Sequence, residues 1–372
     1  MLGWGVALLL IWLYRCAFSV LGQTVVVQLT TLGDADRYQG GVSKFTEVNW
    51  QFFTDSTTFL EGVGLLLSTV TGGSPVLINV IYQSIAFYGI ARLLMAMEPG
   101  LRGPFAVILL LPSFNLWTSV AGKETMIVFA LGALCSLLVE AYYNRARLAP
   151  IHVLAAFLLI LFKPHYYLAL AFVFGLTWAG RRVVQKEALV LVMGLATLVM
   201  LVLVADRVDE LSFRILTHFD HENARSTREP FWVEPFDVFW KAPEGMYLNF
   251  VGPTFEEALR QPLQTLAFAE SMALVAALLA MMLWRLPRIP VYSLLLGLFT
   301  LFWLLFVNYP FGVMNPGSAI RYRAGYLLLV VTVFAFVLSR RVFVNWRAGV
   351  VTGKPRRRRI RVVWRDPPGA AA

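Results

Sequence analysis

Apolar runs recur along most of this chain, and many approach the ~20 residues that a helix needs to cross a bilayer. Hydrophobic residues make up 58% of the sequence and charged residues 15%, against roughly 25% in an ordinary soluble domain. The mean hydropathy is +0.68. Backbone groups in lipid must be satisfied within their own segment, which favours helices. The sequence therefore predicts an all-α, polytopic integral membrane protein and excludes a soluble globular domain.

The apolar runs divide the chain into about ten candidate transmembrane helices. They are 1–21, 75–96, 104–120, 125–142, 150–162, 166–180, 187–205, 265–284, 291–308 and 325–339. Runs 104–120, 150–162 and 166–180 are short for a full crossing and contain or border Pro112 and Pro164, so tilted, broken or re-entrant helices are expected there. The first run has no basic segment before it and no small-residue cleavage site, which favours a retained span over a signal peptide.

The net charge of +10 is concentrated in short connections and in the tail, and is interpreted as a topology signal. With this threading, the basic clusters at Arg92, Arg145, Arg181 and Arg285 fall on the same side as the tail 341–372. Lys and Arg accumulate on the cytoplasmic side of spans, so both termini are predicted to be cytoplasmic. Membrane lipids, and no nucleic acid, are the partners that this pattern indicates.

The predicted organisation is a polytopic transmembrane domain over 1–340 followed by a basic cytoplasmic tail over 341–372. The domain includes two large extracytoplasmic segments, 22–74 and 206–264, and short helices are expected in the second of them, for example over 253–266. Acidic residues had no part in choosing the topology. Among the 22 of them, the cytoplasmic side receives only Glu98, Glu140, Glu187 and Asp366.

Two carboxylates, Asp34 and Asp36, follow the first span in the motif "GDADRY". Such a pair could hold a divalent ion or accept a proton from a sugar hydroxyl. The alternative is an Asx turn that caps a short helix. A divalent metal is compatible with the sequence but is not required by it, and no metal ligands can be assigned. The two cysteines, Cys16 and Cys135, lack metal-ligand or disulfide spacing and are interpreted as packing residues.

Lys123 and Glu124 stand side by side in "LPSFNLWTSVAGKETM", between two apolar runs. The turn between the runs is too short for a loop, so both charges are expected at or just below the membrane surface. Charged side chains are costly there and are usually functional. The alternative is an interfacial role, in which Lys123 extends to the surface and Glu124 stabilises a helix N-terminus.

Two further tight turns on the predicted extracytoplasmic side carry cationic side chains. "LFKPHYYLAL" contains Lys163 and His165, and "NPGSAIRYR" places Arg321 and Arg323 at the start of the last span. Positive-inside statistics disfavour arginines on this side, and two guanidinium groups at the surface suit a phosphate or pyrophosphate. Interfacial extension of the arginines, and a structural hydrogen bond from His165, are the alternatives.

These turns share one side of the membrane, so we expect one polar cleft there. Catalytic carboxylates are predicted at Asp34, Asp36 and Glu124, and substrate phosphate binding at Lys123, Lys163, His165, Arg321 and Arg323. Such a cleft suits a lipid-linked sugar, because the phosphate of that substrate lies at the headgroup level and its glycan extends into water.

The chain resembles polytopic bacterial proteins of polysaccharide gene clusters, namely the EpsG-like and Wzy-type O-antigen polymerases and the C-type membrane glycosyltransferases. The resemblance rests on "GDADRY", "LPSFNLWTSVAGKE", "FKPHYY", "GPTFEEALRQPLQTLAFAES" and "NPGSAIRYR" in this order. It implies a catalytic or metal-associated carboxylate at Asp34 or Asp36 and a pyrophosphate-binding role for Arg321 and Arg323. The arginine-rich large loop of better-known polymerases is not matched by 206–264.

A membrane glycosyltransferase or polysaccharide polymerase of the bacterial inner membrane is therefore the expected function, with a polyprenyl-linked glycan as substrate. A transporter or flippase of lipid-linked oligosaccharide is one alternative, although a carrier is expected to place charges near the bilayer midplane. A non-catalytic subunit that works with other proteins of polysaccharide assembly is the other alternative. The sugar, the linkage and the stereochemical outcome are not encoded in any motif of this chain.

Overall fold

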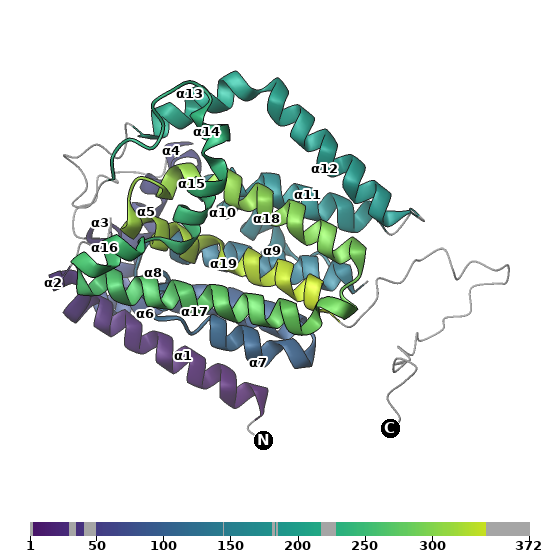
Figure 1. Ribbon diagram of the computed structural model, residues 1–372. Coiled ribbons are helices and arrows are strands. Elements are labelled where there is room, and N and C mark those ends of the chain that lie inside the picture. The colour runs from purple at the N-terminus through teal and green to yellow at the C-terminus, as the bar shows by residue number, and fades with distance from the viewer. Residues whose placement is uncertain are drawn as a thin grey trace, which may run out of the picture.

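A computed structural model of the chain describes residues 3–29, 35–40, 50–143, 145–180, 183, 185–216 and 228–339. Helices are the only regular secondary structure within these residues, which confirms the all-α fold (Figure 1). The predicted tail 341–372 and Asp34 lie outside the described residues.

Seven described helices are long and apolar enough to cross a membrane, and two shorter apolar helices accompany them. The seven are α1 (Trp4–Leu21, continued by a π-helical segment Gly22–Val26), α6 (Pro75–Ala96), α9 (Lys123–Tyr142), α12 (Lys186–Leu203), α17 (Pro262–Arg285), α18 (Val291–Gly312) and α19 (Pro316–Leu338). The shorter pair are α10 (Pro150–Phe162) and α11 (Tyr166–Ala179). A polytopic helical membrane protein is confirmed, whereas the predicted count of ten is not.

The predicted span 104–120 is wrong as a single helix. It is divided between α7 (Pro99–Ile108) and α8 (Pro112–Thr118). Leu111 is extended, with φ −52° and ψ 132°, because the ring of Pro112 excludes the helical conformation at the preceding residue. The interruption expected from Pro112 is therefore present.

A buried arginine joins α8 to the first helix. Arg15, with no exposed surface, donates from Nη1 to Oδ1 of Asn115 at 2.9 Å and from Nη2 to the carbonyl of Thr118 at 2.7 Å. The hydroxyl of Ser19, one turn later, donates to the carbonyl of Ser119 at 2.8 Å. These bonds hold α8 against α1 and leave the start of α9 in a fixed position.

The start of α1 and the end of α19 lie at one end of the bundle, which we call the terminal side. The guanidinium of Arg102 lies 5.8 Å from the ring centroid of Trp4, at the start of α1. The hydroxyl of Ser339, which follows α19, donates to Glu98 at 2.8 Å and lies 3.2 Å from the hydroxyl of Tyr143. The described chain therefore begins and ends on the same side of the membrane domain.

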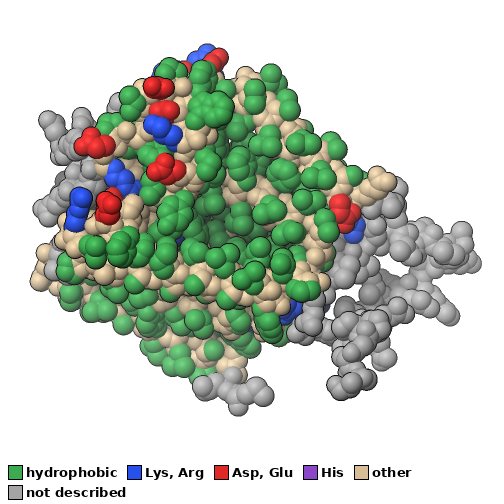
Figure 2. Space-filling model, in the orientation of Figure 1, with side chains coloured by type: hydrophobic (Ala, Val, Ile, Leu, Met, Phe, Trp, Pro, Cys, Tyr) green, Lys and Arg blue, Asp and Glu red, His purple; other side chains and the backbone are tan. Residues whose placement is uncertain are grey.

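The opposite end, which we call the loop side, carries the short helices that do not span. They are α2 (Val27–Leu29), α3 (Ala35–Tyr38), α4 (Trp50–Thr54), α5 (Ser56–Thr71), α13 (Ala205–Leu216), α14 (Asp237–Trp240), α15 (Ala242–Val251) and α16 (Phe255–Arg260). Charged side chains gather mostly around these elements, while apolar side chains dominate the rest of the visible surface (Figure 2). This pattern fits an apolar belt in lipid with polar ends.

The described part of segment 206–264 packs onto the connection between α18 and α19 through Arg228. Its Nη1 donates to the carbonyl of Val313 and its Nη2 to the carbonyl of Gly252, both at 2.7 Å. The same guanidinium pairs with Glu257, which also accepts from the backbone of Thr254 in a capping box at the start of α16. The helix expected over 253–266 is thus present as α16, and α17 follows at Pro262.

The spans α9 and α19 form the centre of the bundle, since both are almost wholly covered by other helices. Gly132 of α9 lies so close to Gly89 of α6 that an added Cβ would come within 2.3 Å of the Gly89 backbone. Small residues allow such close approach of two membrane helices. By contrast, α12 exposes Val192, Leu195 and Val199, as expected for a helix at the lipid boundary.

Candidate functional site

The centre of the candidate site is an ion pair between Glu124 and Arg321. Nε of Arg321 donates to one carboxylate oxygen at 2.8 Å and Nη2 donates to the other at 3.2 Å. The side chain of Glu124 is 4% exposed and that of Arg321 is 22% exposed. The pair is therefore nearly closed to its surroundings, with the arginine as its accessible partner.

Local structure explains why Glu124 has this position. Lys123 and Glu124 are the first two residues of α9, where a carboxylate is favoured by the helix dipole. The loop before them is fixed by Asn79, whose Oδ1 accepts from the backbone of Ala121 at 2.8 Å. The hydroxyl of Thr125 donates back to the carbonyl of Val120 at 2.6 Å. The predicted turn thus orients Glu124 inward rather than toward lipid.

Arg321 is held from the other direction by an aromatic side chain. Its guanidinium carbon lies 5.6 Å from the ring centroid of Trp117 on α8, a distance typical of a cation–π contact. The α8 motif "FNLWTS" therefore supplies a wall of the site as well as a binding partner for Arg15. An aromatic face and a carboxylate together fix the plane of the Arg321 fork.

Lys163 joins this pair from the turn between α10 and α11. Its ammonium nitrogen lies 4.1 Å from the ring centroid of Tyr322 and 5.2 Å from that of Phe311. Burial lowers the pKa of Lys163 to about 8, although the nearby carboxylate of Glu124 opposes this effect. Arg321 lowers the pKa further. The lysine is therefore a cation near neutral pH that loses its proton in mildly alkaline solution.

His165 is part of the same turn, but it brings no positive charge. Its ring stacks on Phe311 with 4.7 Å between centroids, and its Nε2 is buried without a hydrogen-bond partner among the described residues. Burial, and then the charge of Lys163, lower its pKa to about 3. The imidazole is neutral at physiological pH, so any contact with a phosphate would be a neutral hydrogen bond.

Lys123 lies at the edge of the site toward α5. Its ammonium donates to the hydroxyl of Thr57 at 3.1 Å, and the carboxylate of Asp55 lies within electrostatic range of it. Asp55 itself caps α5 by accepting from the backbone of Thr58 at 2.7 Å. We refer to Lys123, Glu124, Lys163, His165 and Arg321 as the loop-side cluster. Its ionised members are three cations and one carboxylate.

Arg323 does not belong to this cluster, which corrects the prediction of a two-arginine clamp. Residues two positions apart on a helix point in nearly opposite directions. Arg323 is 2% exposed, donates to Ser271 at 2.6 Å and to the carbonyl of Phe250 at 2.9 Å, and lies 3.6 Å from Glu270. Its surroundings are α15 and α17, and only Arg321 faces Glu124.

The first-loop aspartates are only partly placed. Asp34 lies outside the described residues, and Asp36 is exposed on α3, where it forms no ion pair with another described residue. Its neighbour Ala35 packs against Val120, in contact with Trp117. The helix α3 is thus adjacent to the loop before α9, but the structure does not bring the Asp36 carboxylate to Glu124.

Within the described residues, no group of three or more His, Cys, Asp or Glu side chains is arranged to hold a metal ion. Cys135 is buried and Cys16 is half-buried, and both are free thiols. The hypothesis of a divalent ion at Asp34 and Asp36 therefore depends on a residue outside the described part of the chain.

Two charged residues inside the apolar runs were missed by motif reasoning. Glu270 accepts from the backbone of Ser113 at 2.8 Å and pairs with Arg323, and Arg15 binds α8. Glu270 lies within the predicted span 265–284, and Arg15 within 1–21. An ionisable residue inside a span is itself a signal of a buried partner or a functional site.

Comparison of the chain with protein-family models, curated proteins and solved structures finds no match.

Proposed function

We propose that this chain is a polymerase-like glycosyltransferase of the bacterial inner membrane. Its donor would be a glycan on polyprenyl phosphate or pyrophosphate, and its acceptor a sugar hydroxyl at the extracytoplasmic face. The observation that carries this proposal is the loop-side cluster, in which Lys123, Lys163 and Arg321 surround the carboxylate of Glu124. With Asp55 near Lys123 included, the three half-buried cations still exceed the two carboxylates by one. An excess of positive charge favours an anion, and a phosphate at the membrane surface is such an anion.

The chemistry follows from the charges. An acceptor hydroxyl oxygen attacks the anomeric carbon of the donor sugar, and the bond from that carbon to the phosphate oxygen breaks. The hydroxyl proton passes to a carboxylate, for which Glu124 is the buried candidate and Asp34 or Asp36 the alternatives. The electron pair remains on the departing lipid phosphate, whose charge Arg321 and Lys163 stabilise.

The ion pair between Glu124 and Arg321 imposes an order on donor binding and proton transfer. In the structure, both oxygens of Glu124 accept hydrogen bonds from Arg321. A phosphate that binds Arg321 competes with this carboxylate and releases it as a base. Proton acceptance by Glu124 would thus follow donor binding, which limits unproductive protonation of the site.

The polyprenyl-linked glycan is the proposed substrate partner, in contact with membrane lipids, and other proteins of polysaccharide assembly are compatible partners. Both termini are proposed to be cytoplasmic, because basic residues lie at the terminal side: Arg102 in α7, Arg145 and Arg147 in the connection between α9 and α10, and Lys186 at the start of α12.

A transporter of lipid-linked oligosaccharide has one observation in its favour. Arg323 lies seven residues into α19 and Glu270 eight residues into α17, about 10–12 Å along each helix. Charges at such depth are typical of transport pathways. Here, however, they are engaged by Ser113, Ser271 and the carbonyl of Phe250, so they act as a closed link between helices.

The test is a gene deletion complemented with Glu124→Gln, Arg321→Lys or wild-type chain. If the chain is a polymerase, the deletion and the Glu124→Gln strain accumulate lipid carrier bearing a single repeat unit on the extracytoplasmic face. A flippase defect leaves that intermediate on the cytoplasmic face. Exposed Glu210→Gln is the matched control, because Glu210 pairs with Arg207 and Arg214 at the surface. Normal polymer from Glu124→Gln, at normal protein level, contradicts a catalytic role for this carboxylate.

A further inference from the structure

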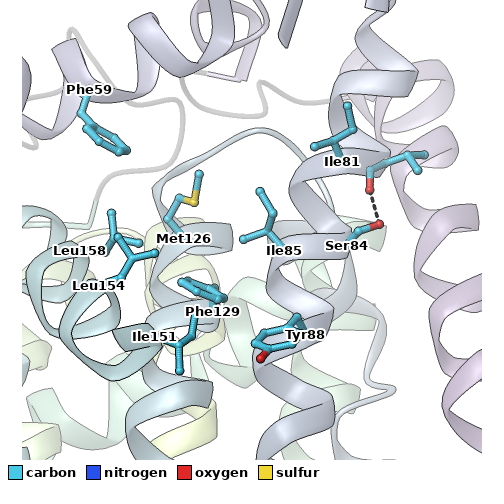
Figure 3. Close-up of a pocket in the computed structure, with 11 residues that line it drawn as sticks. Phe59, Ile81, Ser84, Ile85, Tyr88, Met126, Phe129, Ile151, Leu154 and Leu158 are labelled. Carbon is cyan, nitrogen blue, oxygen red and sulfur yellow. Dashed lines mark hydrogen bonds between the residues drawn. The ribbon is translucent and has the colours of Figure 1, made fainter. Parts of the chain in front are cut away.

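An apolar groove opens in the wall of the bundle between α6 and α10 (Figure 3). Its volume is about 630 Å³. Met126 and Phe129 of α9 form its floor, Ile85 of α6 and Leu154 of α10 stand on opposite walls, and Phe59 of α5 closes one end. The lining is almost entirely hydrocarbon.

The few hydroxyl groups at the groove are already engaged. Ser84 donates to the carbonyl of Val80 at 2.7 Å and accepts from the indole of Trp12 at 3.0 Å. The hydroxyl of Tyr88 accepts from Arg92 at 3.3 Å. An occupant of the groove therefore meets packing surfaces rather than hydrogen-bonding groups, which fits a hydrocarbon chain.

The groove leads to the loop-side cluster along two helices. Lys123, Met126 and Phe129 follow one another at intervals of three residues on α9, so the cation stands at the head of the apolar stripe. On α10, Leu158 is one turn before Phe162, whose ring contacts Phe59 with 5.9 Å between centroids. The end closed by Phe59 is therefore level with the start of α9.

The dimensions fit one lipid chain in one leaflet. The groove runs along α6 from Val80 to Tyr88, which are eight residues and about 12 Å apart. Half of the hydrocarbon core of a bilayer is about 15 Å thick. A groove of this length accommodates the headgroup-proximal part of a single chain, whereas a two-chain phospholipid would leave its second chain outside.

We propose that this groove holds the isoprenoid chain of a polyprenyl phosphate, with the phosphate at Lys123. The assignment rests on the proposed function for the choice of lipid, and it adds the path of the chain. Bilayer chains are as apolar as the groove, so moving a chain from lipid into it gains little by itself. Selectivity must then come from the phosphate and from the single-chain shape.

The experiment uses the full chain in nanodiscs and a polyprenyl phosphate with a diazirine in its isoprenoid chain. We expect photolabelling at the groove, mapped by mass spectrometry, with unlabelled polyprenyl phosphate competing at least about tenfold better than polyprenol, as one charge-assisted hydrogen bond allows. Polyprenyl phosphate should also compete better than phosphatidylglycerol, because the second chain of that lipid does not fit the groove. Lys123→Gln should remove the advantage over polyprenol. Leu154→Trp should fill the groove and lower labelling, whereas Val153→Trp, its more exposed neighbour outside the lining, should not.

Equal competition by phosphatidylglycerol would overturn the proposal and identify the groove as an ordinary lipid-contact surface. Equal labelling of the Leu154→Trp and Val153→Trp variants would place the chain elsewhere. Because the readout is binding rather than glycan transfer, its outcome is separate from that of the proposed function. Selective labelling with normal polymer in Glu124→Gln cells would leave the groove assigned and the catalytic role of Glu124 rejected.

Discussion

Arg321 is 197 residues from Glu124 in the sequence, yet its guanidinium donates to both oxygens of that carboxylate, at 2.8 and 3.2 Å. The pair connects α9 with α19, the two most enclosed helices of the bundle. A bidentate bond of this kind fixes direction as well as distance. The relative rotation of these two helices is therefore specified at the loop side by a polar contact.

The energetic weight of this pair can be measured with a double-mutant cycle. Glu124→Gln keeps the shape of the side chain but leaves the guanidinium without its charged partner. We expect the free energy of unfolding to fall toward the lower end of the roughly 3–5 kcal/mol that breaking a buried pair costs, because Arg321 retains 22% exposure. Arg321→Gln should have a similar effect, and the double variant should lose less than the sum.

The free energy of unfolding for this cycle can be measured in bicelles by steric trapping. The control is Glu210→Gln, since Glu210 pairs with Arg214 on an exposed surface of α13, and its loss should leave the free energy of unfolding nearly unchanged. Strict additivity of the Glu124 and Arg321 variants would mean that the two side chains do not interact in the membrane.

The two arginines of α19 should respond differently to lysine. In Arg321→Lys, the charge remains but the bidentate fork is lost, so we expect polymer formation to fall while the protein stays folded. In Arg323→Lys, one ammonium cannot replace a guanidinium that reaches both Ser271 and the carbonyl of Phe250. The main effect of this variant should therefore be a lower thermal stability. Measuring thermal stability and polymer length for both variants separates these outcomes. If both variants lost the same property to the same extent, the two arginines would not have different roles.

Anion binding at the loop-side cluster should depend on pH through Lys163. The ammonium of Lys163 has a pKa of about 8, so it loses its proton as the pH rises through this value. The groups around it are Glu124, Arg321, Lys123 and the ring of Tyr322. Phosphate affinity should therefore weaken between about pH 7 and 9. Titration of inorganic phosphate against wild-type and Lys163→Met chains tests this, because the variant should bind more weakly with a flatter profile. A wild-type profile without any pH dependence would contradict it.

The free energy of unfolding should move in the opposite direction as the pH rises. Folding lowers the pKa of Lys163 from its ordinary 10.5, so the charged form opposes folding. This destabilisation is fully present below about pH 8 and is relieved as the pH rises toward 10.5. The Lys163→Met variant should lack that gain.

The orientation of the bundle can be tested with single cysteines in a background without Cys16 and Cys135. Glu234→Cys lies on the loop side and Arg147→Cys in the connection between α9 and α10. Both positions are exposed, so a membrane-impermeant maleimide should label the first in intact cells and the second only after permeabilisation. Labelling of Arg147→Cys in intact cells would reverse the proposed topology and move the loop-side cluster to the cytoplasm.

The sequence was most informative where composition alone decides the structure. The predicted spans 75–96 and 150–162 match α6 and α10 at both ends, because apolar length and flanking Pro75 and Pro150 define them. Run 104–120 was counted as one span although a break was expected near Pro112, and the structure divides it there between α7 and α8. Counting it as a span contributed to the predicted total of ten.

For the candidate site, the sequence supplied the residues but not their pairing. The short turn predicts that Lys123 and Glu124 lie near the membrane surface, but the partner of Glu124 depends on the rotation of α19. That rotation separates Arg321 from Arg323, which a motif containing both could not distinguish. Glu270 was not predicted as a site residue because it lies within the long apolar run that forms α17.

The buried Arg15 makes the docking of α1 depend on the order in which the chain is synthesised. Within the described residues its guanidinium is bound only by neutral groups, and Asn115 is made 100 residues later than Arg15. Until α8 exists, α1 must hold this cation in or near lipid, at a cost of roughly 2.5–3.5 kcal/mol near a helix centre. The docking of α1 therefore awaits α8, a helix of seven residues that is too short to span the bilayer.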